Sequence, residues 1–331
     1  MSAMFTNLMD FLFCPLRGMC VARRAIIGAG GGAMIGRFLI RILNAQRGWA
    51  KPLGDFNVRW QGALLRPIRP IKDFLNGKWI GHSLHAAITD IPIGAITVAL
   101  LLDFLNIRGA ADIALGLGIL AMIGAAVAGT ADYVDTDDDA RVAATVHSTL
   151  MVIALVLFVV SLVMRLASPD GDRTLAIALS VVAYVVMTAG AWVGGEVVYA
   201  MGNMVNRHAW RFGSKSNWVK LDLADIPENT PTPGKAGAQS LVVVRQGDRV
   251  YALHAQCAHA NGPLAEGRIV DGCIECPWHY SRFELGTGHR KQGPSTFDQP
   301  VYEVRTATGG GWEVRRRIPG QSPQPAATEA G

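Results

Sequence analysis

The chain has 331 residues, which is long enough for two domains of ordinary size. Half of its residues are hydrophobic and only 17% are charged, whereas charged residues make up about a quarter of a typical soluble domain. This shortage of charge argues against an entirely soluble protein and indicates a membrane portion. The net charge of +5 is modest, and the sequence has no basic patch interleaved with aromatic residues, so no nucleic acid partner is expected.

Residues 1–46 are predicted to be an N-terminal extension. Its apolar, glycine-rich stretch at 25–36 is cut short by Arg37 and Arg41, so it is too short to span a bilayer. It also lacks the small-residue cleavage site of a secretory signal. We expect this extension to be disordered, or its first part (residues 1–33) to come from an upstream start codon.

Residues 47–81 combine tryptophans with lysines and arginines. Trp49, Trp60 and Trp79 are spread along this segment between the basic residues. Such a mixture is typical of a segment that lies among lipid headgroups, with its tryptophans inward and its cations outward. We assign it as a basic interfacial segment, with a soluble linker as the alternative interpretation.

Residues 82–202 contain four hydrophobic stretches, and each reaches the roughly 20 residues needed to cross a bilayer as a helix. These stretches cover residues 84–106, 110–131, 143–165 and 174–200. The connecting loops are short, so neighbouring helices should be antiparallel. The sequence therefore predicts an all-α transmembrane four-helix bundle.

Basic residues flank this bundle unevenly. They gather before the first span and after the fourth, whereas the opposite loops hold only Arg108, Arg165 and Arg173. The positive-inside rule then places both ends of the bundle in the cytoplasm. We expect a multi-pass protein of the bacterial plasma (inner) membrane, with its C-terminal domain in the cytoplasm.

Histidines inside the spans are functional candidates, because titratable groups are costly there. His82 and His85 open the first span one helical turn apart, and His147 lies near the start of the third. In one interpretation, His85 (or His82) and His147 are the axial ligands of a b-type haem. In another, they form hydrogen bonds with Asp132, Glu196 or water. A quinone pocket or a proton-handling site is a third.

The sequence changes character from Trp218, where short runs with β-strand patterning begin. They cover residues 218–223, 240–246, 249–255, 268–275, 281–285, 300–305 and 311–317. Three glycines at 309–311 are typical of a hairpin turn. We predict an all-β antiparallel domain over residues 216–317, followed by a disordered tail at 318–331.

Two Cys/His pairs lie in loops of this domain: Cys257 with His259, and Cys276 with His279. This ligand set can hold a [2Fe-2S] cluster, with both cysteines on one iron and both histidines on the other. A zinc site is the alternative, although zinc pairs usually have two to four residues between their ligands. Five cysteines in all, an odd number, argue against a disulfide framework and favour a reducing compartment.

Residues 257–264 (CAHANGPL) and 276–283 (CPWHYSRF) resemble the paired cluster-binding loops of Rieske-type ferredoxins. Gly286-Thr287-Gly288 and Gly293-Pro294 also match that family, so that the resemblance covers roughly residues 217–317. It implies an antiparallel β-fold and a [2Fe-2S] cluster. It also implies that Cys257 and Cys276 hold one iron, and His259 and His279 the other.

Four further positions around the loops are informative within this resemblance. Respiratory Rieske proteins have an extra cysteine in each loop, whereas this chain has Gly262 and Trp278 there, so their disulfide is absent. Ser281 matches a serine that hydrogen-bonds the cluster in high-potential members, but Phe283 replaces their tyrosine. The resemblance implies a reduction potential below that of the respiratory type, within the Rieske range of about −150 to +300 mV. Cys273 is interpreted as a core thiol.

The membrane portion also resembles a known family. His82-Ser83-Leu84-His85, residues 90–94 and residues 194–202 resemble a bacterial four-helix membrane domain of unknown function. A fusion of that domain with a Rieske domain accounts for the whole chain.

The leading hypothesis is a membrane-anchored iron–sulfur protein that carries single electrons between a membrane redox partner and another acceptor. The partner could be haem, a quinone or another protein. A ferredoxin component of an oxygenase or reductase system, or a zinc-stapled membrane protein without redox activity, are the alternatives. A complete Rieske oxygenase needs a mononuclear iron, typically held by two histidines and one carboxylate, in a sizeable catalytic domain. After His279 only His289 remains, and the sequence shows no such domain. An electron-transfer protein is therefore expected rather than a complete enzyme.

Overall fold

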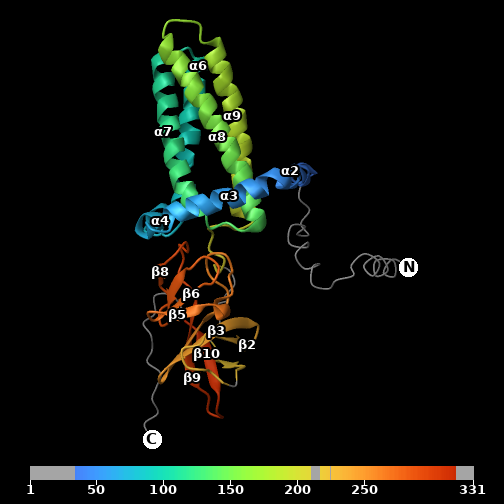
Figure 1. Cartoon of the computed structure of the whole chain (residues 1–331), viewed down its shortest axis with the longest axis vertical. Helices are drawn as coiled ribbons and strands as arrows, with labels where there is room; N and C mark the ends of the chain where they lie inside the picture. Colours follow the sequence, from blue (N-terminus) through green and yellow to red (C-terminus); the bar gives the residue numbers. More distant parts are fainter. Residues whose placement is uncertain (1–33, 210–216, 224, 318–331) are drawn as a thin grey trace, which may run out of the picture. The chain divides into compact units, whose positions relative to one another are not determined.

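The computed structural model describes residues 34–209, 217–223 and 225–317 (Figure 1). It divides into two compact units, residues 1–45 and 46–331. The described part of the first unit is the helix α2 (Met34–Ala45), which lies within the predicted N-terminal extension. Residues 1–33 and the predicted tail at 318–331 lie outside the described residues.

The second unit opens with the helices α3 (Arg47–Leu65) and α4 (Arg69–Leu75), within the predicted interfacial segment. The exposed side chains of Phe56, Trp60 and Leu64 follow one another at four-residue spacing, so they share one face of α3. Elsewhere on the helix, Ala50 and Gly54 are buried. An apolar face left exposed in this way is what a helix at a membrane surface requires.

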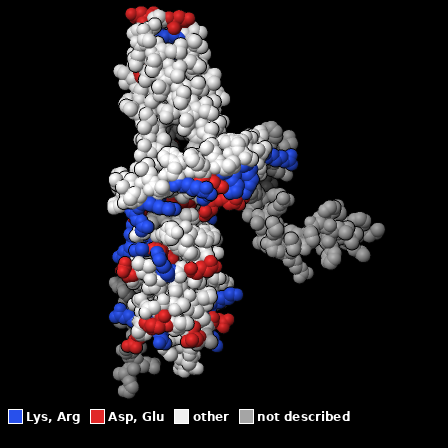
Figure 2. All heavy atoms as spheres, in the orientation of Figure 1, with Lys and Arg blue, Asp and Glu red and all other residues white. Residues whose placement is uncertain are grey.

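The structure has four apolar helical segments that are long enough to span a membrane, as predicted. They are α5 (Leu84–Ile88) with α6 (Asp90–Phe104), α7 (Arg108–Tyr133), α8 (Asp138–Ala167), and α9 (Thr174–Gly195) with the π-turn η2 (Glu196–Ala200). On the face shown in Figure 2, these helices carry almost no charged side chains between their ends, whereas charges gather along α3 and over the β-domain. The predicted all-α bundle of four long apolar helices is confirmed.

Two details of the predicted spans are corrected. The first span consists of two helices, α5 and α6, which are separated at Thr89. The third begins at Asp138 rather than at residue 143. Acidic residues in the first turn of a helix interact favourably with its dipole, so Asp138 and Asp139 belong to α8 rather than to the preceding loop.

A buried network of charges holds the bundle together at the end away from α3. The fully buried guanidinium of Arg165 donates to both carboxylate oxygens of Asp103, at 2.7 and 2.8 Å, and joins α8 to α6. Arg173 binds the carboxylate of Asp112 on α7 at 3.0 and 2.9 Å. Arg165 was expected to be a loop cation, but it lies in the last turn of α8. Its charge can be buried there because Asp103 on the neighbouring helix α6 neutralises it.

The β-domain follows the bundle and is confirmed as antiparallel. Its six-stranded sheet has the order β1-β10-β9-β4-β3-β2, and its four-stranded sheet the order β5-β6-β7-β8. The strands of the larger sheet are β1 (Val219–Leu221), β2 (Thr232–Ala236), β3 (Gln239–Gln246), β4 (Arg249–His254), β9 (Val301–Thr306) and β10 (Trp312–Arg316). Those of the smaller sheet are β5 (Arg268–Val270), β6 (Cys273–Glu275), β7 (Arg282–Glu284) and β8 (Arg290–Gln292).

The strand pattern differs from the sequence prediction in two ways. The predicted strand 268–275 is a hairpin, because Asp271 and Gly272 have φ angles of 49° and 72° and form a turn between β5 and β6. The strands β2 and β8 were missed. Proline and glycine interrupt the β pattern of β2, and β8 consists of three polar residues.

The pair formed by Arg165 and Asp103 should be essential for the stability of the bundle. Replacing Arg165 by leucine leaves a carboxylate buried without its partner, and we expect the free energy of unfolding to fall by about 3–5 kcal/mol. Unfolding with dodecyl sulfate in detergent micelles measures this change. The double variant Arg165→Leu/Asp103→Leu removes both charges and should recover most of the loss. A single variant as stable as the natural protein would contradict the role given to this pair.

Candidate metal centre

The first predicted ligand loop connects β4 to the short helix η3 (Leu264–Glu266). The amide of Cys257 donates to the carbonyl of Gly262 at 2.8 Å, and the amide of Asn261 donates back to the carbonyl of Cys257 at 2.9 Å. Asn261 has a φ of 63°, in the left-handed region that asparagine tolerates. The loop is therefore closed by its own backbone, with His259 at its tip.

The second ligand loop connects β6 to β7 and closes in the same way. The amide of Cys276 donates to the carbonyl of Ser281 at 2.9 Å, and the amide of Tyr280 donates back to Cys276 at 3.1 Å. Tyr280 has a φ of 61°, which matches Asn261 in the first loop. Two equivalent turns thus present one cysteine and one histidine each.

The structure brings all four predicted ligands together. Cys257 and Cys276 are buried, and the ring centres of His259 and His279 lie 4.9 Å apart. Both ring nitrogens of His259 and the Nδ1 atom of His279 are buried without a hydrogen-bond partner in the described part of the chain. Buried polar atoms are almost always paired, so unpaired nitrogens beside two buried thiols fit a group that the protein binds through them.

A single zinc ion and a two-iron cluster would use the same four donors differently. Within the described ranges, no three His, Cys, Asp or Glu side chains converge on a single ion. A zinc site with two cysteines and two histidines needs all four ligands at one position. A Rieske cluster takes only two protein ligands at each iron, which is the arrangement expected here.

Electrostatics prepare these side chains for ligation. Interaction with Cys257 lowers the pKa of Cys276 to about 7, whereas burial raises the pKa of Cys257. A low thiol pKa favours the thiolate that a metal requires. Burial also lowers the pKa of His259 well below its usual range, so this imidazole is neutral and keeps a lone pair for a metal.

Gly262 provides the space between the two loops. A Cβ atom at this position would lie 2.7 Å from the sulfur of Cys276 and 3.2 Å from the ring of Trp278. Gly262 and Trp278 stand where respiratory Rieske proteins have their disulfide, and here the two residues contact each other. The absence of a side chain at Gly262 therefore lets the two loops approach without a covalent link.

Two polar side chains outside the set of proposed ligands form hydrogen bonds that support the loops. Gln299 accepts a hydrogen bond from the amide of Ala258 at 2.8 Å and donates to the carbonyls of His254 and Gln256, so it fixes the first loop. The hydroxyl of Ser281, which is fully buried, accepts from the amide of Ser295 at 3.2 Å. Gln299 was not identified from the sequence, because it lies far along the chain from the loop that it supports.

The loop between α7 and α8 contacts the second ligand loop. The Nε2 atom of His279 lies 3.1 Å from a carboxylate oxygen of Asp137, the residue that precedes α8. The neighbouring Asp135 is buried and forms an ion pair with Lys72 of α4. The hydrogen bond with His279 lowers the pKa of Asp137, so this carboxyl is ionised at neutral pH. The acidic run was visible in the sequence, but nothing in its local pattern pointed to a partner on the β-domain.

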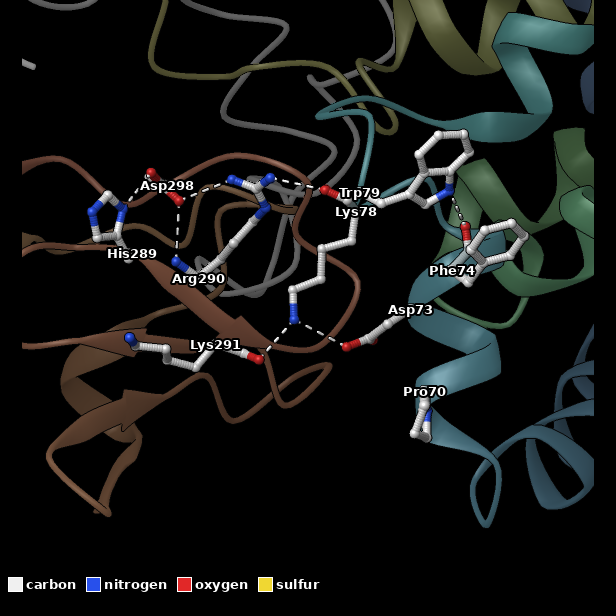
Figure 3. Close-up of a pocket in the computed structure, with 9 residues that line it drawn as sticks. All are labelled: Pro70, Asp73, Phe74, Lys78, Trp79, His289, Arg290, Lys291 and Asp298. Carbon is white, nitrogen blue, oxygen red and sulfur yellow. Dashed lines mark hydrogen bonds and ion pairs between the residues drawn. The ribbon is translucent and has the colours of Figure 1, made fainter.

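A second contact lies between the segment after α4 and the strand β8 (Figure 3). The ammonium of Lys78 donates to the carbonyl of Lys291 at 2.7 Å and pairs with Asp73 at 3.1 Å. The guanidinium of Arg290 donates to the carbonyl of Lys78 at 2.9 Å and also binds Asp298. These bonds flank an open cleft of about 610 Å³, which is lined by the stacked rings of Phe74 and Trp79.

The histidines of the bundle fall into two groups. His85 on α5 and His147 on α8 form a pair with ring centres 6.0 Å apart. His82 is exposed and does not share a helix face with His85, contrary to the prediction. The reason is Ser83, which has an extended ψ of 124°, caps α5, and donates to Asp132 at 2.6 Å, so the chain before it is not helical. Among the described residues, the hydrogen bonds of His85 and His147 go to the carbonyls of Ala125 and Gly190 rather than to Asp132 or Glu196.

Comparison with known proteins assigns both parts of the chain. Residues 216–303 match the family described as "Rieske [2Fe-2S] domain", and residues 81–207 match "Predicted membrane protein (DUF2231)". Both resemblances inferred from the sequence are thereby confirmed.

Individual relatives align with the β-domain. The anthranilate 1,2-dioxygenase ferredoxin subunit of Burkholderia cepacia is 36% identical over 95 residues, which are 28% of this chain and 88% of the relative. Ferredoxin CarAc of Metapseudomonas resinovorans is 34% identical over 94 residues, again 28% and 88%. A chain in the solved complex of reduced oxygenase and oxidized ferredoxin in carbazole 1,9a-dioxygenase is 31% identical, with a TM-score of 0.28, and the match covers 31% of this chain and 99% of that one. The chain therefore belongs to the Rieske-type [2Fe-2S] ferredoxins, with their electron-transfer domain joined here to a four-helix membrane domain.

Proposed function

We propose that this protein is a membrane-anchored carrier of single electrons, with a redox partner at the membrane. The observation that carries this proposal is the position of the histidine ligands. His279 is bonded to the loop before α8, and its side chain is only 11% exposed. The histidine side of the ligand loops therefore faces the membrane domain, and an electron can pass between the two without a soluble intermediary.

Each ligand has a separate role in this proposal. Cys257 and Cys276 hold one iron as thiolates, and His259 and His279 hold the other through their unpaired nitrogens. When bound, the [2Fe-2S] cluster supplies reversible one-electron oxidation and reduction. Asp137 accepts the Nε2–H of His279, which leaves the Nδ1 lone pair for the iron and fixes the orientation of the ring.

A second candidate function is that of a ferredoxin component in an oxygenase system. It is favoured by the relatives, whose names assign them to anthranilate 1,2-dioxygenase and to related systems. Trp278 and Tyr280 flank His279 and are about half exposed, so they offer an aromatic surface to a soluble partner. Electron delivery to a soluble oxygenase at a rate unaffected by removal of the membrane domain would favour this candidate over a membrane partner.

We also propose that the protein lies in a bacterial plasma membrane with its Rieske domain in the cytoplasm. The cations before α5 and after η2 support this orientation through the positive-inside rule. Protection of the Rieske domain from protease in inside-out vesicles would contradict it.

Metal analysis and electron paramagnetic resonance of the detergent-purified protein test the proposed function. We expect about two irons and two acid-labile sulfides per chain, with a Rieske-type signal after reduction. Replacing His259 by alanine should abolish the signal. The matched control is His289→Ala, because His289 is exposed and contacts Asp298 instead of the ligand loops. Zinc without acid-labile sulfide would show a structural metal site and would refute electron transfer.

A substitution at Gly262 tests the close approach of the two loops. The variant Gly262→Ala places a methyl group against the sulfur of Cys276, and we expect the cluster content per chain to fall several-fold, since such crowding costs about 1–3 kcal/mol. Acid-labile sulfide and visible absorbance measure the content. Gly309→Ala is the control, because a Cβ there meets no atom within 4 Å. Equal cluster content in the two variants would show that the loops are not tightly packed at Gly262.

The charge of Asp137 should affect the reduction potential. Reduction adds negative charge beside His279, and the ionised carboxylate opposes it, so Asp137→Asn should raise the midpoint potential, on the order of tens of millivolts. A redox titration followed by paramagnetic resonance measures the shift. Asp139→Asn is the control, because Asp139 pairs with Arg47 rather than with His279. An unchanged potential in the Asp137 variant would mean that the two parts are not docked in solution.

A further inference from the structure

We propose that His85 and His147 are the two axial ligands of a b-type haem inside the membrane bundle. Both histidines are anchored in the same manner, each to a neighbouring helix. The Nδ1 atom of His85 lies 2.8 Å from the carbonyl of Ala125 on α7, and the Nδ1 atom of His147 lies 2.8 Å from the carbonyl of Gly190 on α9. A carbonyl can only accept, so each ring carries its proton on Nδ1.

This tautomer leaves the Nε2 lone pair of both rings available. No other hydrogen bond of either ring occurs among the residues that the structure describes. A histidine that ligates a metal typically donates its other ring N–H to a carbonyl or carboxylate, which fixes the ring and increases its basicity. Both imidazoles thus have the arrangement of a metal ligand.

Glycines on the neighbouring helices make room for the rings. A Cβ atom at Gly129 would lie 3.0 Å from the His85 ring, and one at Gly194 would lie 2.9 Å from the His147 ring. In each case the glycine follows the anchoring carbonyl by one helical turn, from Ala125 to Gly129 on α7 and from Gly190 to Gly194 on α9. The His85 ring thus packs closely against the backbone of α7, and the His147 ring packs in the same way against the backbone of α9.

The spacing and the number of ligands indicate a haem rather than a bare metal ion. Two imidazoles that bind one metal through Nε2 atoms at about 2 Å have ring centres roughly 6 Å apart, and the observed distance is 6.0 Å. The described residues provide no third His, Cys, Asp or Glu ligand at this pair. A porphyrin supplies the four remaining donors itself, so two axial histidines are sufficient. Figure 2 shows a narrow gap between the helices of the bundle, just above α3.

One proposed haem ligand, His147, belongs to the helix that begins at the contact with the Rieske domain. Asp137, which binds His279, immediately precedes α8, and His147 follows it by about 15 Å of helix rise. A haem held by His85 and His147 would supply reversible one-electron exchange with a [2Fe-2S] cluster held by the Rieske loops, each electron lost by one being gained by the other. This exchange rests on the proposed function, whereas haem binding rests on the bundle alone.

Haem analysis of the detergent-purified full chain, after expression with sufficient haem supply, tests the proposal. We expect about one haem b per chain by the pyridine haemochromogen assay, with a low-spin ferric signal typical of two histidine ligands. The double variant His85→Ala/His147→Ala should lose haem roughly tenfold or more. His82→Ala is the matched control and should keep it, because His82 is exposed and separate from the pair.

Each single variant separates ligation from folding. His85→Ala or His147→Ala should convert any remaining haem from low spin to high spin, which itself requires a folded bundle, while the Rieske signal reports that the β-domain is still folded. Natural protein without haem, or with an unchanged low-spin spectrum in either single variant, would overturn the haem site. Stoichiometric copper or zinc at the pair without haem would overturn it as well. Haem present without a [2Fe-2S] cluster would instead refute the proposed electron carrier and leave the haem site standing.

Discussion

The hydrogen bond between His279 and Asp137 is the constraint on which the relation of the two domains depends. It connects His279, a proposed ligand of the cluster, to the residue that precedes α8, and Asp135 in the same loop is held by Lys72 of α4. The histidine side of the Rieske domain consequently faces the end of the bundle rather than solvent. Lys78 and Arg290 add hydrogen bonds to backbone carbonyls at a second point, which opposes rotation about the first contact.

The metal centre itself is organised locally. Each ligand loop closes on its own cysteine through two backbone hydrogen bonds, with a residue of positive φ at the same place in both loops. The loops need only be brought together by the smaller sheet, and the absence of a side chain at Gly262 permits their contact. This preorganised backbone holds the buried ring nitrogens of His259 and His279 in place. Apolar side chains at the same positions would be more stable than buried polar nitrogens without partners.

The two ends of the membrane bundle use polar residues in opposite ways. At the far end, Arg165 and Asp103 satisfy each other in a buried ion pair, which is costly to break and makes that end rigid. At the end near the Rieske domain, His85 and His147 are each only half satisfied, because one nitrogen of each ring binds a backbone carbonyl. Paired charges serve structure, whereas an oriented but incompletely bonded imidazole can serve ligand binding.

Much of this molecule was predictable because the relevant signals are local in sequence. The four apolar helices follow from continuous apolar stretches, and the proposed metal ligands follow from the spacing of Cys257, His259, Cys276 and His279 within two short loops. The strands β2 and β8 could not be predicted, because their pairing partners stabilise them against an unfavourable composition.

The remaining features depend on residues far apart in the chain, whose proximity no local pattern encodes. Only the tertiary structure excluded His82 from the bundle pair, through the capping of α5 by Ser83 and its bond to Asp132. It likewise revealed Asp137 as the partner of His279, and Ala125 and Gly190 as the anchors of the two bundle histidines. The sequence by itself determined which side chains can bind metals, and the packing of distant segments decided which of their nitrogens are free to do so.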